Sequence, residues 1–114
     1  MSTVYLFGDE AGNFDFSGGS GASRYFILTT VTMGNCQPGD RLQALRRRLA
    51  WQGVHLGAVL HATEDPQPVR DEVFKMLALC DMRIDATIIA KHSIPAGLRD
   101  PHGLYRHVWQ EHFA

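Results

Sequence analysis

The chain has 114 residues, of which 45% are hydrophobic and 20% are charged, a composition that fits one globular domain and excludes a disordered segment. The formal net charge is -1, so no overall charge attracts the protein to nucleic acid or to a membrane, and either partner would need a local patch. We therefore expect residues 1–114 to form a single α/β domain, or the N-terminal part of a longer domain.

The cysteines and the N-terminus indicate the compartment. Cys36 and Cys80 lie far apart and match neither a zinc motif nor a disulfide framework, so two buried thiols are the simplest interpretation. The first residues lack the basic segment of a secretory signal peptide, and no stretch approaches the ~20 apolar residues of a membrane span. These features predict a cytoplasmic protein with no membrane partner.

The first third of the chain predicts two strands and a helix. Residues 3–8 and 24–33 are apolar and rich in β-branched or aromatic residues, which predicts strands. The glycine-rich residues 11–23 between them predict a loop that joins the strands into an antiparallel hairpin. Leucines spaced three and four residues apart then predict a helix over residues 40–52, which Gly53 ends.

The rest of the chain predicts two more strands and two more helices. The short apolar segment 54–62 predicts a strand, and two prolines then precede a helix whose apolar face begins at Val69. Residues 82–91 have the strongest strand pattern, and Ile89 interrupts their alternation, as expected of a strand covered on both faces. Residues 104–113 begin a last helix. The predicted order is β-β-α-β-α-β-α.

An acidic pair ends the first predicted strand. Asp9 and Glu10 follow an apolar run and precede a glycine-containing turn. Successive side chains of a strand point to opposite faces, so at least one carboxylate is directed toward a buried or half-buried surface, where a charge is costly without a cation. Mg²⁺ prefers carboxylate oxygens and needs only one or two of them. From the pair alone, a metal site and a solvated turn fit equally well.

A second polar group follows the predicted strand over residues 54–62. His61 stands at the strand end, and Glu64 and Asp65 come three and four residues later. If this strand lies beside the first, the two polar groups meet at one edge of the sheet, where ligands gather in open α/β sheets. The alternatives are a helix cap at Asp65, a helix-dipole contact of Glu64 and a core histidine at His61.

Lys91 ends the most strand-like segment. A lysine there can neutralise carboxylates or hold a phosphate, although a lysine that extends to solvent from a strand end is common. Asp85 lies on the same strand face. It either completes an acidic cluster or is an exposed residue on a half-covered sheet, and the second interpretation is favoured.

Two other patterns carry weaker predictions. The arginines at 46–48, with Arg41 before them, can contact a phosphate backbone, but such a run is more often a solvated helix face. His102, His107 and His112 recur every five residues, so they fan around a helix and match no zinc motif.

Several short motifs occur in the order of one known family. Residues 5–13, with the run Asp9-Glu10-Ala11-Gly12-Asn13, resemble the Asp-Glu-Ser-Gly-Asn opening of an uncharacterised bacterial family, the domain of unknown function numbered three thousand eight hundred. Later elements of that family resemble, in the same order, residues 24–28, Leu60-His61-Ala62, residues 69–77, Ile88-Ile89-Ala90-Lys91 and Tyr105. The resemblance implies a ribonuclease H-like α/β fold with a mixed sheet and a metal-dependent, nuclease-like site.

The leading hypothesis is a hydrolase of phosphodiester bonds in nucleic acid that depends on Mg²⁺ or Mn²⁺. The candidate catalytic residues are Asp9, Glu10, His61 and Lys91, and the candidate metal ligands are Asp9, Glu10 and Glu64. In this hypothesis Asp9 ligates the ion with help from Glu10. His61 or Glu64 positions or deprotonates a water, and Lys91 stabilises phosphate charge.

Two departures from the family weaken this hypothesis. Ala11 replaces the serine, and Ala90 replaces the aspartate before Lys91, so one metal ligand can be missing. Family members also continue for about as long again, which predicts a fold that is incomplete at its C-terminus. The alternatives are a non-catalytic or truncated module that self-associates as a homodimer through a sheet edge, and a nucleic-acid-binding domain that uses the arginine run.

Overall fold

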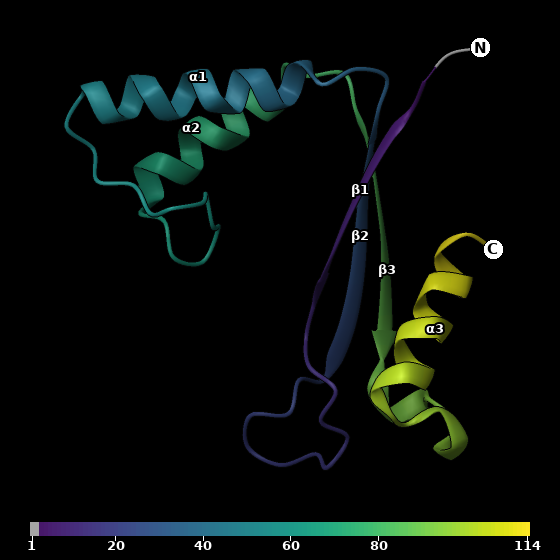
Figure 1. Cartoon of the computed structure of the whole chain (residues 1–114). Helices are drawn as coiled ribbons and strands as arrows, with labels where there is room; N and C mark the ends of the chain where they lie inside the picture. The colour runs from purple at the N-terminus through teal and green to yellow at the C-terminus, as the bar shows by residue number, and fades with distance from the viewer. Residues whose placement is uncertain (1–2) are drawn as a thin grey trace. The chain divides into compact units, whose positions relative to one another are not determined.

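The structure is a computed structural model that describes residues 3–114 (Figure 1). Met1 and Ser2, which belong to the segment considered as a signal peptide, lie outside the described residues. The chain divides into two compact units: unit 1 holds residues 33–82 with the N-terminal residues up to Tyr5, and unit 2 holds residues 6–32 and 83–114. Each unit has its own hydrophobic cluster. No helix in the described part of the chain is long and apolar enough to cross a membrane.

Unit 1 is built on two packed helices, α1 (Gln37–Trp51) and α2 (Gln67–Leu77). Helix α1 begins three residues before the predicted start because proline is well tolerated in a first helical turn. It ends as predicted. Gly53 has φ +80°, and the amides of Gly53 and Val54 donate to the carbonyls of Ala50 and Leu49, which closes the helix with a Schellman motif.

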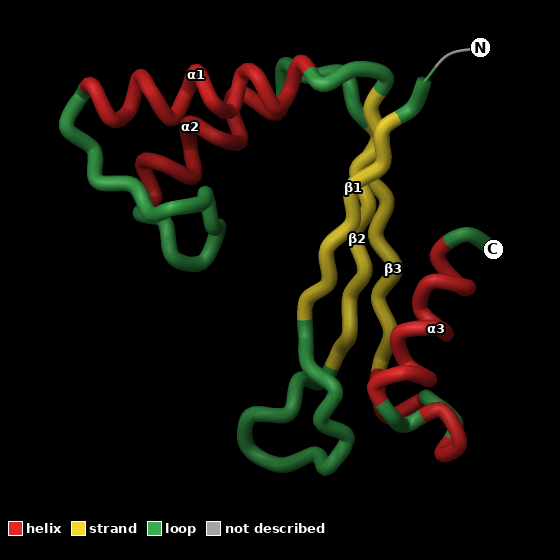
Figure 2. The backbone as a smooth tube through the Cα atoms, in the orientation of Figure 1, coloured by secondary structure: helices red, strands yellow, loops and turns green. Residues whose placement is uncertain are grey.

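The predicted strand over residues 54–62 is wrong, and this segment is the loop between α1 and α2 (Figure 2). Its alternating apolar residues Val54, Leu56 and Leu60 pack against the unit 1 cluster. That cluster consists of Leu45, Leu49 and Val69. The alternation therefore reflects apolar side chains that pack against two helices, in a loop with bends at Ala58 and Val59. The helices and strands follow the order β-β-α-α-β-α.

The sheet has three antiparallel strands in the order β1-β2-β3. The strands are β1 (Tyr5–Ala11), β2 (Tyr25–Met33) and β3 (Arg83–Ala90). Phe26 lies opposite Ile89, and Thr30 lies opposite Asp85. The α/β class and the β1–β2 hairpin are therefore confirmed. The ribonuclease H-like arrangement stays a prediction.

Helix α3 (Pro101–His112) covers one face of the sheet in unit 2 (Figure 1). Asp100 caps the helix by accepting a hydrogen bond from the amide of Gly103 at 2.8 Å, so α3 starts three residues before the predicted start. Leu104 and Val108 are fully buried against Phe26, as the apolar pattern of the helix predicts. Two 3₁₀ helices, η1 (Lys91–Ser93) and η2 (Ala96–Leu98), connect β3 to α3.

The other face of the sheet is open within unit 2. Ile84 and Ile88 alternate on this face and are 60% and 64% exposed. The expectation that β3 is covered on both faces is therefore wrong for unit 2. Ile89 interrupts the alternation because it lies on the opposite face, where it packs against the cluster under α3.

Candidate functional site

Asp9 and Glu10 both lie in β1, in unit 2, and both are exposed. A Cβ at Gly8 would lie 3.3 Å from Trp109 and 3.5 Å from Thr30, so position 8 faces α3. By the alternation of a strand, Glu10 shares the α3 side and Asp9 lies on the open face. The Asp9 carboxylate accepts a hydrogen bond from the amide of Glu10 at 2.9 Å. The two side chains diverge and do not share one ion.

His61 and Glu64 lie in unit 1, in an exposed turn before α2 that is not the end of a strand. The Asp65 carboxylate accepts a hydrogen bond from the amide of His61 at 2.7 Å, and the Thr63 hydroxyl pairs with His61 Nδ1 at 2.9 Å. Arg70 donates to the carbonyl of Asp65 at 2.6 Å. Asp65 therefore stabilises this turn, and no side chain caps α2. His61 is exposed, so it is not a core histidine.

Across residues 3–114, no three His, Cys, Asp or Glu side chains are grouped so that they could hold a metal ion. Mg²⁺ is often bound through only one or two carboxylates together with waters and substrate phosphates, so a site with Asp9 as its one carboxylate ligand stays a prediction. Glu10 lies on the other face of β1, and Glu64 lies in the other unit. The divalent metal site stays a prediction.

Lys91 has an unusual environment for a charged residue, because its side chain is buried and only 5% of the residue is exposed. Its ammonium donates to the carbonyl oxygens of Asn13 and Asp15 at 3.0 and 2.6 Å. It also donates to Asn13 Oδ1 and to the Ser23 hydroxyl, both at 3.1 Å. The ring centroid of Phe16 lies 5.4 Å away. Three N–H groups thus serve four acceptors, and this lysine neither extends to solvent nor keeps an N–H for a phosphate.

Asn13 organises the loop that Lys91 holds. Its Oδ1 accepts hydrogen bonds from the amides of Ser23 and Asp15 at 3.1 and 3.2 Å, and its Nδ2 donates to the carbonyl of Gly21 at 2.7 Å. The preceding Gly12 has φ +102°. Lys91 is a candidate residue from the sequence and Asn13 is the last residue of the acidic opening motif, and the structure joins the two directly. No local pattern indicated this pairing, because 78 positions separate the two residues.

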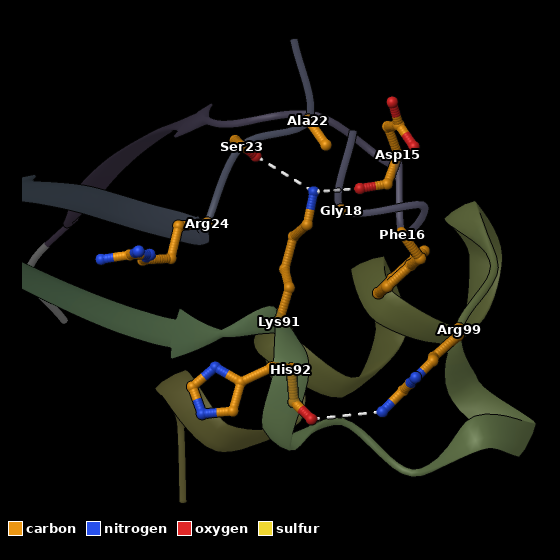
Figure 3. Close-up of a pocket in the computed structure, with 9 residues that line it drawn as sticks. All are labelled: Asp15, Phe16, Gly18, Ala22, Ser23, Arg24, Lys91, His92 and Arg99. Carbon is orange, nitrogen blue, oxygen red and sulfur yellow. Dashed lines mark hydrogen bonds between the residues drawn. The ribbon is translucent and has the colours of Figure 1, made fainter. Parts of the chain in front are cut away.

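A cavity of about 420 Å³ adjoins this buried lysine, between the glycine-rich loop and the segment that follows β3 (Figure 3). We call it the Lys91 pocket. Its lining consists of Asp15, Phe16, Gly18, Ala22, Ser23, Arg24, Lys91, His92 and Arg99. In Figure 3, Lys91 occupies the centre, with Arg24 and His92 on one side and Phe16 and Arg99 on the other. The carbonyls of Ile94 and His92 accept hydrogen bonds from Arg99 at 2.8 and 3.2 Å, which orients its guanidinium.

Positive charge dominates the Lys91 pocket. The Asp15 carboxylate is its one acidic group, and hydrogen bonds from the side chain and the amide of Ser17 hold its pKa below the ordinary value, with a smaller contribution from the charge of Lys91. Among the lining residues, the positive charges of Lys91, Arg24 and Arg99 outnumber this single negative charge at neutral pH. The excess of positive charge favours an anionic ligand.

The arginine run does not form a single patch. Arg46 donates to the carbonyl of Gly57 at 3.0 Å, and Arg48 pairs with Glu72 at 2.9 Å. Arg47 lies beside Trp51. Side chains at consecutive helix positions point about 100° apart, so the three guanidinium groups have different neighbours.

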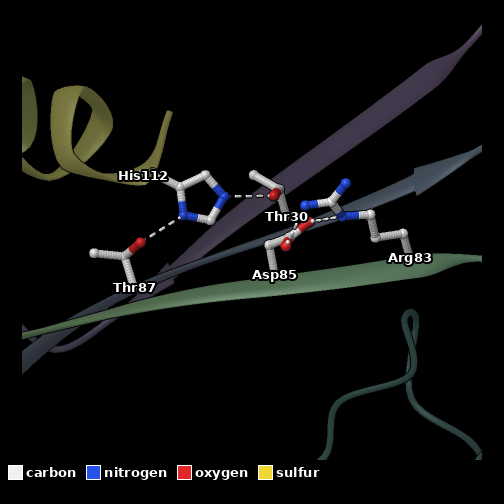
Figure 4. Close-up of polar contacts among 5 residues, drawn as sticks. All are labelled: Thr30, Arg83, Asp85, Thr87 and His112. Carbon is white, nitrogen blue, oxygen red and sulfur yellow. Dashed lines mark hydrogen bonds and ion pairs between the residues drawn. The ribbon is translucent and has the colours of Figure 1, made fainter. Parts of the chain in front are cut away.

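His112 joins α3 to the sheet (Figure 4). Its Nε2 lies 2.6 Å from the Thr30 hydroxyl on β2, and its Nδ1 lies 2.8 Å from the Thr87 hydroxyl on β3. Nearby, Asp85 pairs with Arg83 at 2.9 Å and does not complete an acidic cluster. These contacts explain His112 as a structural residue, and Asp85 is a partly exposed residue in a surface ion pair.

Comparison with known proteins adds no relative: no family model matches the chain, and no match is found among curated proteins or solved structures. The family resemblance is therefore carried by the short motifs alone and stays a prediction.

Proposed function

We propose that this protein binds the phosphate groups of nucleic acid at the Lys91 pocket and hydrolyses phosphodiester bonds with Mg²⁺ or Mn²⁺ held at Asp9. The observation that carries the proposal is the cationic lining of the pocket, where Arg24, Arg99 and Lys91 outnumber the single carboxylate of Asp15. Guanidinium groups match phosphate oxygens in charge and in bidentate geometry.

The hydrogen bonds of Lys91 modify the role predicted for it. Its N–H groups are all engaged with the glycine-rich loop, so Lys91 supplies charge and holds the pocket wall. The direct phosphate contacts then belong to Arg24 and Arg99. These arginines flank Lys91 on opposite sides, which suits successive phosphates of a polymer better than one isolated phosphate (Figure 3).

The position of Asp9 also favours a polymeric substrate. Asp9 lies four residues before Asn13, and four residues span at most about 14 Å, a limit that the bend at Gly12 (φ +102°) shortens. Phosphates of one duplex strand follow each other every ~3.4 Å along the helix axis, so the pocket and Asp9 would contact different phosphates of the same strand. When bound, a divalent ion would supply a hydroxide nucleophile and stabilise the phosphate oxygens. Catalytic roles for Glu10, His61 and Glu64 stay predictions from the sequence, and the proposal rests on Asp9 and the Lys91 pocket, both in unit 2.

Binding and cleavage are tested separately. In EDTA, fluorescence anisotropy with a labelled single-stranded oligonucleotide should show at least about tenfold weaker binding for Arg24→Glu, with a shallower salt dependence. Arg106→Glu on the exposed surface of α3 is the matched control, because it makes the same charge change in the same unit. Equal weakening by both variants would refute a specific role of the pocket.

The cleavage assay uses the same oligonucleotide with Mg²⁺ or Mn²⁺. Asp9→Asn should abolish metal-dependent cleavage and leave binding in EDTA unchanged, because Asp9 holds the ion and the pocket holds the phosphates. Cleavage by Asp9→Asn at the wild-type rate would place the ion elsewhere. A wild-type protein that binds but never cleaves would remove the hydrolase from the proposal and leave the binding function.

A second candidate function is self-association through the open face of the sheet, where Phe7, Ile84 and Ile88 are all more than half exposed. A three-stranded face of this length covers about 350 Å². This is well below the ~800 Å² per partner of a standard interface, so we expect a weak homodimer. Asp9 lies on the same face, so dimerisation and metal binding at Asp9 would exclude each other. Sedimentation equilibrium should show a dimer that Ile88→Lys dissociates, and a wild-type monomer at every concentration would contradict this candidate.

A further inference from the structure

Unit 1 has a recess of its own, a groove of about 500 Å³ between α1 and α2. We call it the α1–α2 groove. Helix α1 contributes Arg41, Ala44 and Arg48, and α2 with the turn after it contributes Lys75, Met76 and Leu79. All of these residues belong to unit 1 and are independent of the Lys91 pocket.

The floor of the groove is apolar. The groove-lining positions follow helical spacing on both sides, from Arg41 to Arg48 on α1 and from Glu72 to Met76 on α2, and Leu79 lies in the turn after α2. Met76 is half-buried, whereas Leu79 is 74% exposed although it is a large aliphatic residue. A stretch of seven residues on a helix is ~10 Å long, so the floor can receive about two turns of a partner helix.

The rim of the groove is basic. Glu72 is the one acidic residue that lines it, and its carboxylate is bonded to Arg48 at 2.9 Å. Among the described residues, Arg41 and Lys75 form no ion pair. The charge of Lys75 helps to lower the pKa of the Glu72 carboxyl, so the lining holds three positive charges, Arg41, Arg48 and Lys75, against one negative charge.

We propose that the α1–α2 groove binds an acidic amphipathic helix of another protein. Apolar side chains at i, i+3/i+4 and i+7 of the partner would cover Met76 and Leu79, and carboxylates beside them would pair with Arg41 and Lys75. The occupant differs from a nucleic acid because no aromatic ring lines the groove for base stacking. A nucleic acid would also leave the apolar floor exposed.

The partner is also not a second copy of this chain. Among the described helices, α1 carries four arginines and one aspartate, α2 has two basic and two acidic residues, and α3 has one arginine and one glutamate. None of the three is an acidic helix, so charge complementarity requires a different protein.

The test uses a labelled synthetic peptide of about five helical turns, with leucines at i, i+3, i+4 and i+7 and glutamates elsewhere. A peptide of the same composition with scrambled order, and a single-stranded oligonucleotide, serve as the other probes. Fluorescence anisotropy with the full chain should show saturable binding of the striped peptide, weaker binding of the scrambled peptide, and no competition by the oligonucleotide.

The variants assign the binding to the groove. Lys75→Glu and Leu79→Asp should each weaken binding of the striped peptide at least tenfold, because one removes a rim charge and the other introduces a carboxylate on the floor. Arg47→Glu is the matched control, because Arg47 lies on α1 outside the groove. Circular dichroism checks that each variant keeps its helices.

Three results would overturn the proposal. They are the absence of saturable binding up to about 1 mM peptide, equal binding of the striped and scrambled peptides, and equal weakening by Lys75→Glu and Arg47→Glu. Each is independent of the proposed nucleic-acid function, which is tested with variants in unit 2.

Discussion

Lys91→Met tests whether one buried ammonium holds the glycine-rich loop. Methionine keeps most of the volume of the side chain but removes the donor for Asn13, Asp15 and Ser23. Hydrogen bonds that involve a charged group contribute ~1.5–3 kcal/mol each. The variant also avoids the free-energy cost of burying an ammonium in the folded state, which offsets part of the loss. We expect a net loss of about 3 kcal/mol, a large part of the ~5–15 kcal/mol that stabilises a typical domain.

The two tryptophans allow this loss to be measured in unit 2 alone. Trp109 lies in unit 2, partly buried beside the core, and Trp51 lies in unit 1 and is 90% exposed. In a Trp51→Phe background, urea unfolding followed by fluorescence reports on unit 2. Limited chymotrypsin digestion should also become faster within the loop, after Phe14. Lys75→Met changes the chain's other lysine, which is exposed, and should cost less than about 0.5 kcal/mol. If the unfolding free energy of Lys91→Met lies within about 0.5 kcal/mol of wild type and proteolysis is unchanged, Lys91 does not hold the loop.

Two further predictions concern the loop and the helix pair. Gly12→Ala should destabilise unit 2 by at least about 2 kcal/mol in the same fluorescence assay, because φ is +102° and the new Cβ would lie 2.5 Å from the carbonyl oxygen of Tyr25. Gly18→Ala, where φ is +74° and no atom lies within 4 Å, should cost less, and an equal cost would contradict the steric explanation. The hydrogen bond from Arg48 holds the pKa of Glu72 below its ordinary value of 4.5, so the linked stabilisation is present above that value and is lost as the pH falls through the lowered pKa. In NMR titrations, Arg48→Met should move the Glu72 midpoint back toward 4.5, and an unchanged midpoint would show that Arg48 is not the cause.

Residues 54–62 show why local patterning predicted one strand too many. An alternating apolar pattern requires only that every second side chain is covered, and two helices can provide that cover as well as a sheet can. Val54, Leu56 and Leu60 pack against the helices of unit 1, and no strand bonds to their backbone. The pattern indicated side chains that are covered, but not that helices cover them, and the strand predicted from it is wrong.

The candidate site shows the same limit. Lys91 was predicted from a short motif to stabilise phosphate charge. In the structure its ammonium donates instead to oxygens of the glycine-rich loop, including Asn13 Oδ1. The sequence did not indicate Arg24 and Arg99 as candidate site residues, because a single arginine outside a periodic pattern does not mark a ligand site. The acidic pair at Asp9 and Glu10 was located correctly in β1, and only the strand alternation shows that its carboxylates diverge.

The sequence by itself determined the α/β class, the β1–β2 hairpin, the three helices and the ends of helices at residues such as Gly53, because propensity, periodicity and capping act over a few neighbouring residues. The tertiary structure alone decided that Lys91 is buried, that its ammonium closes the glycine-rich loop, and that two arginines flank it. These features depend on contacts between residues far apart in the chain. Their physical basis is the need to satisfy a buried charge, and that need arises only when folding removes the charge from water.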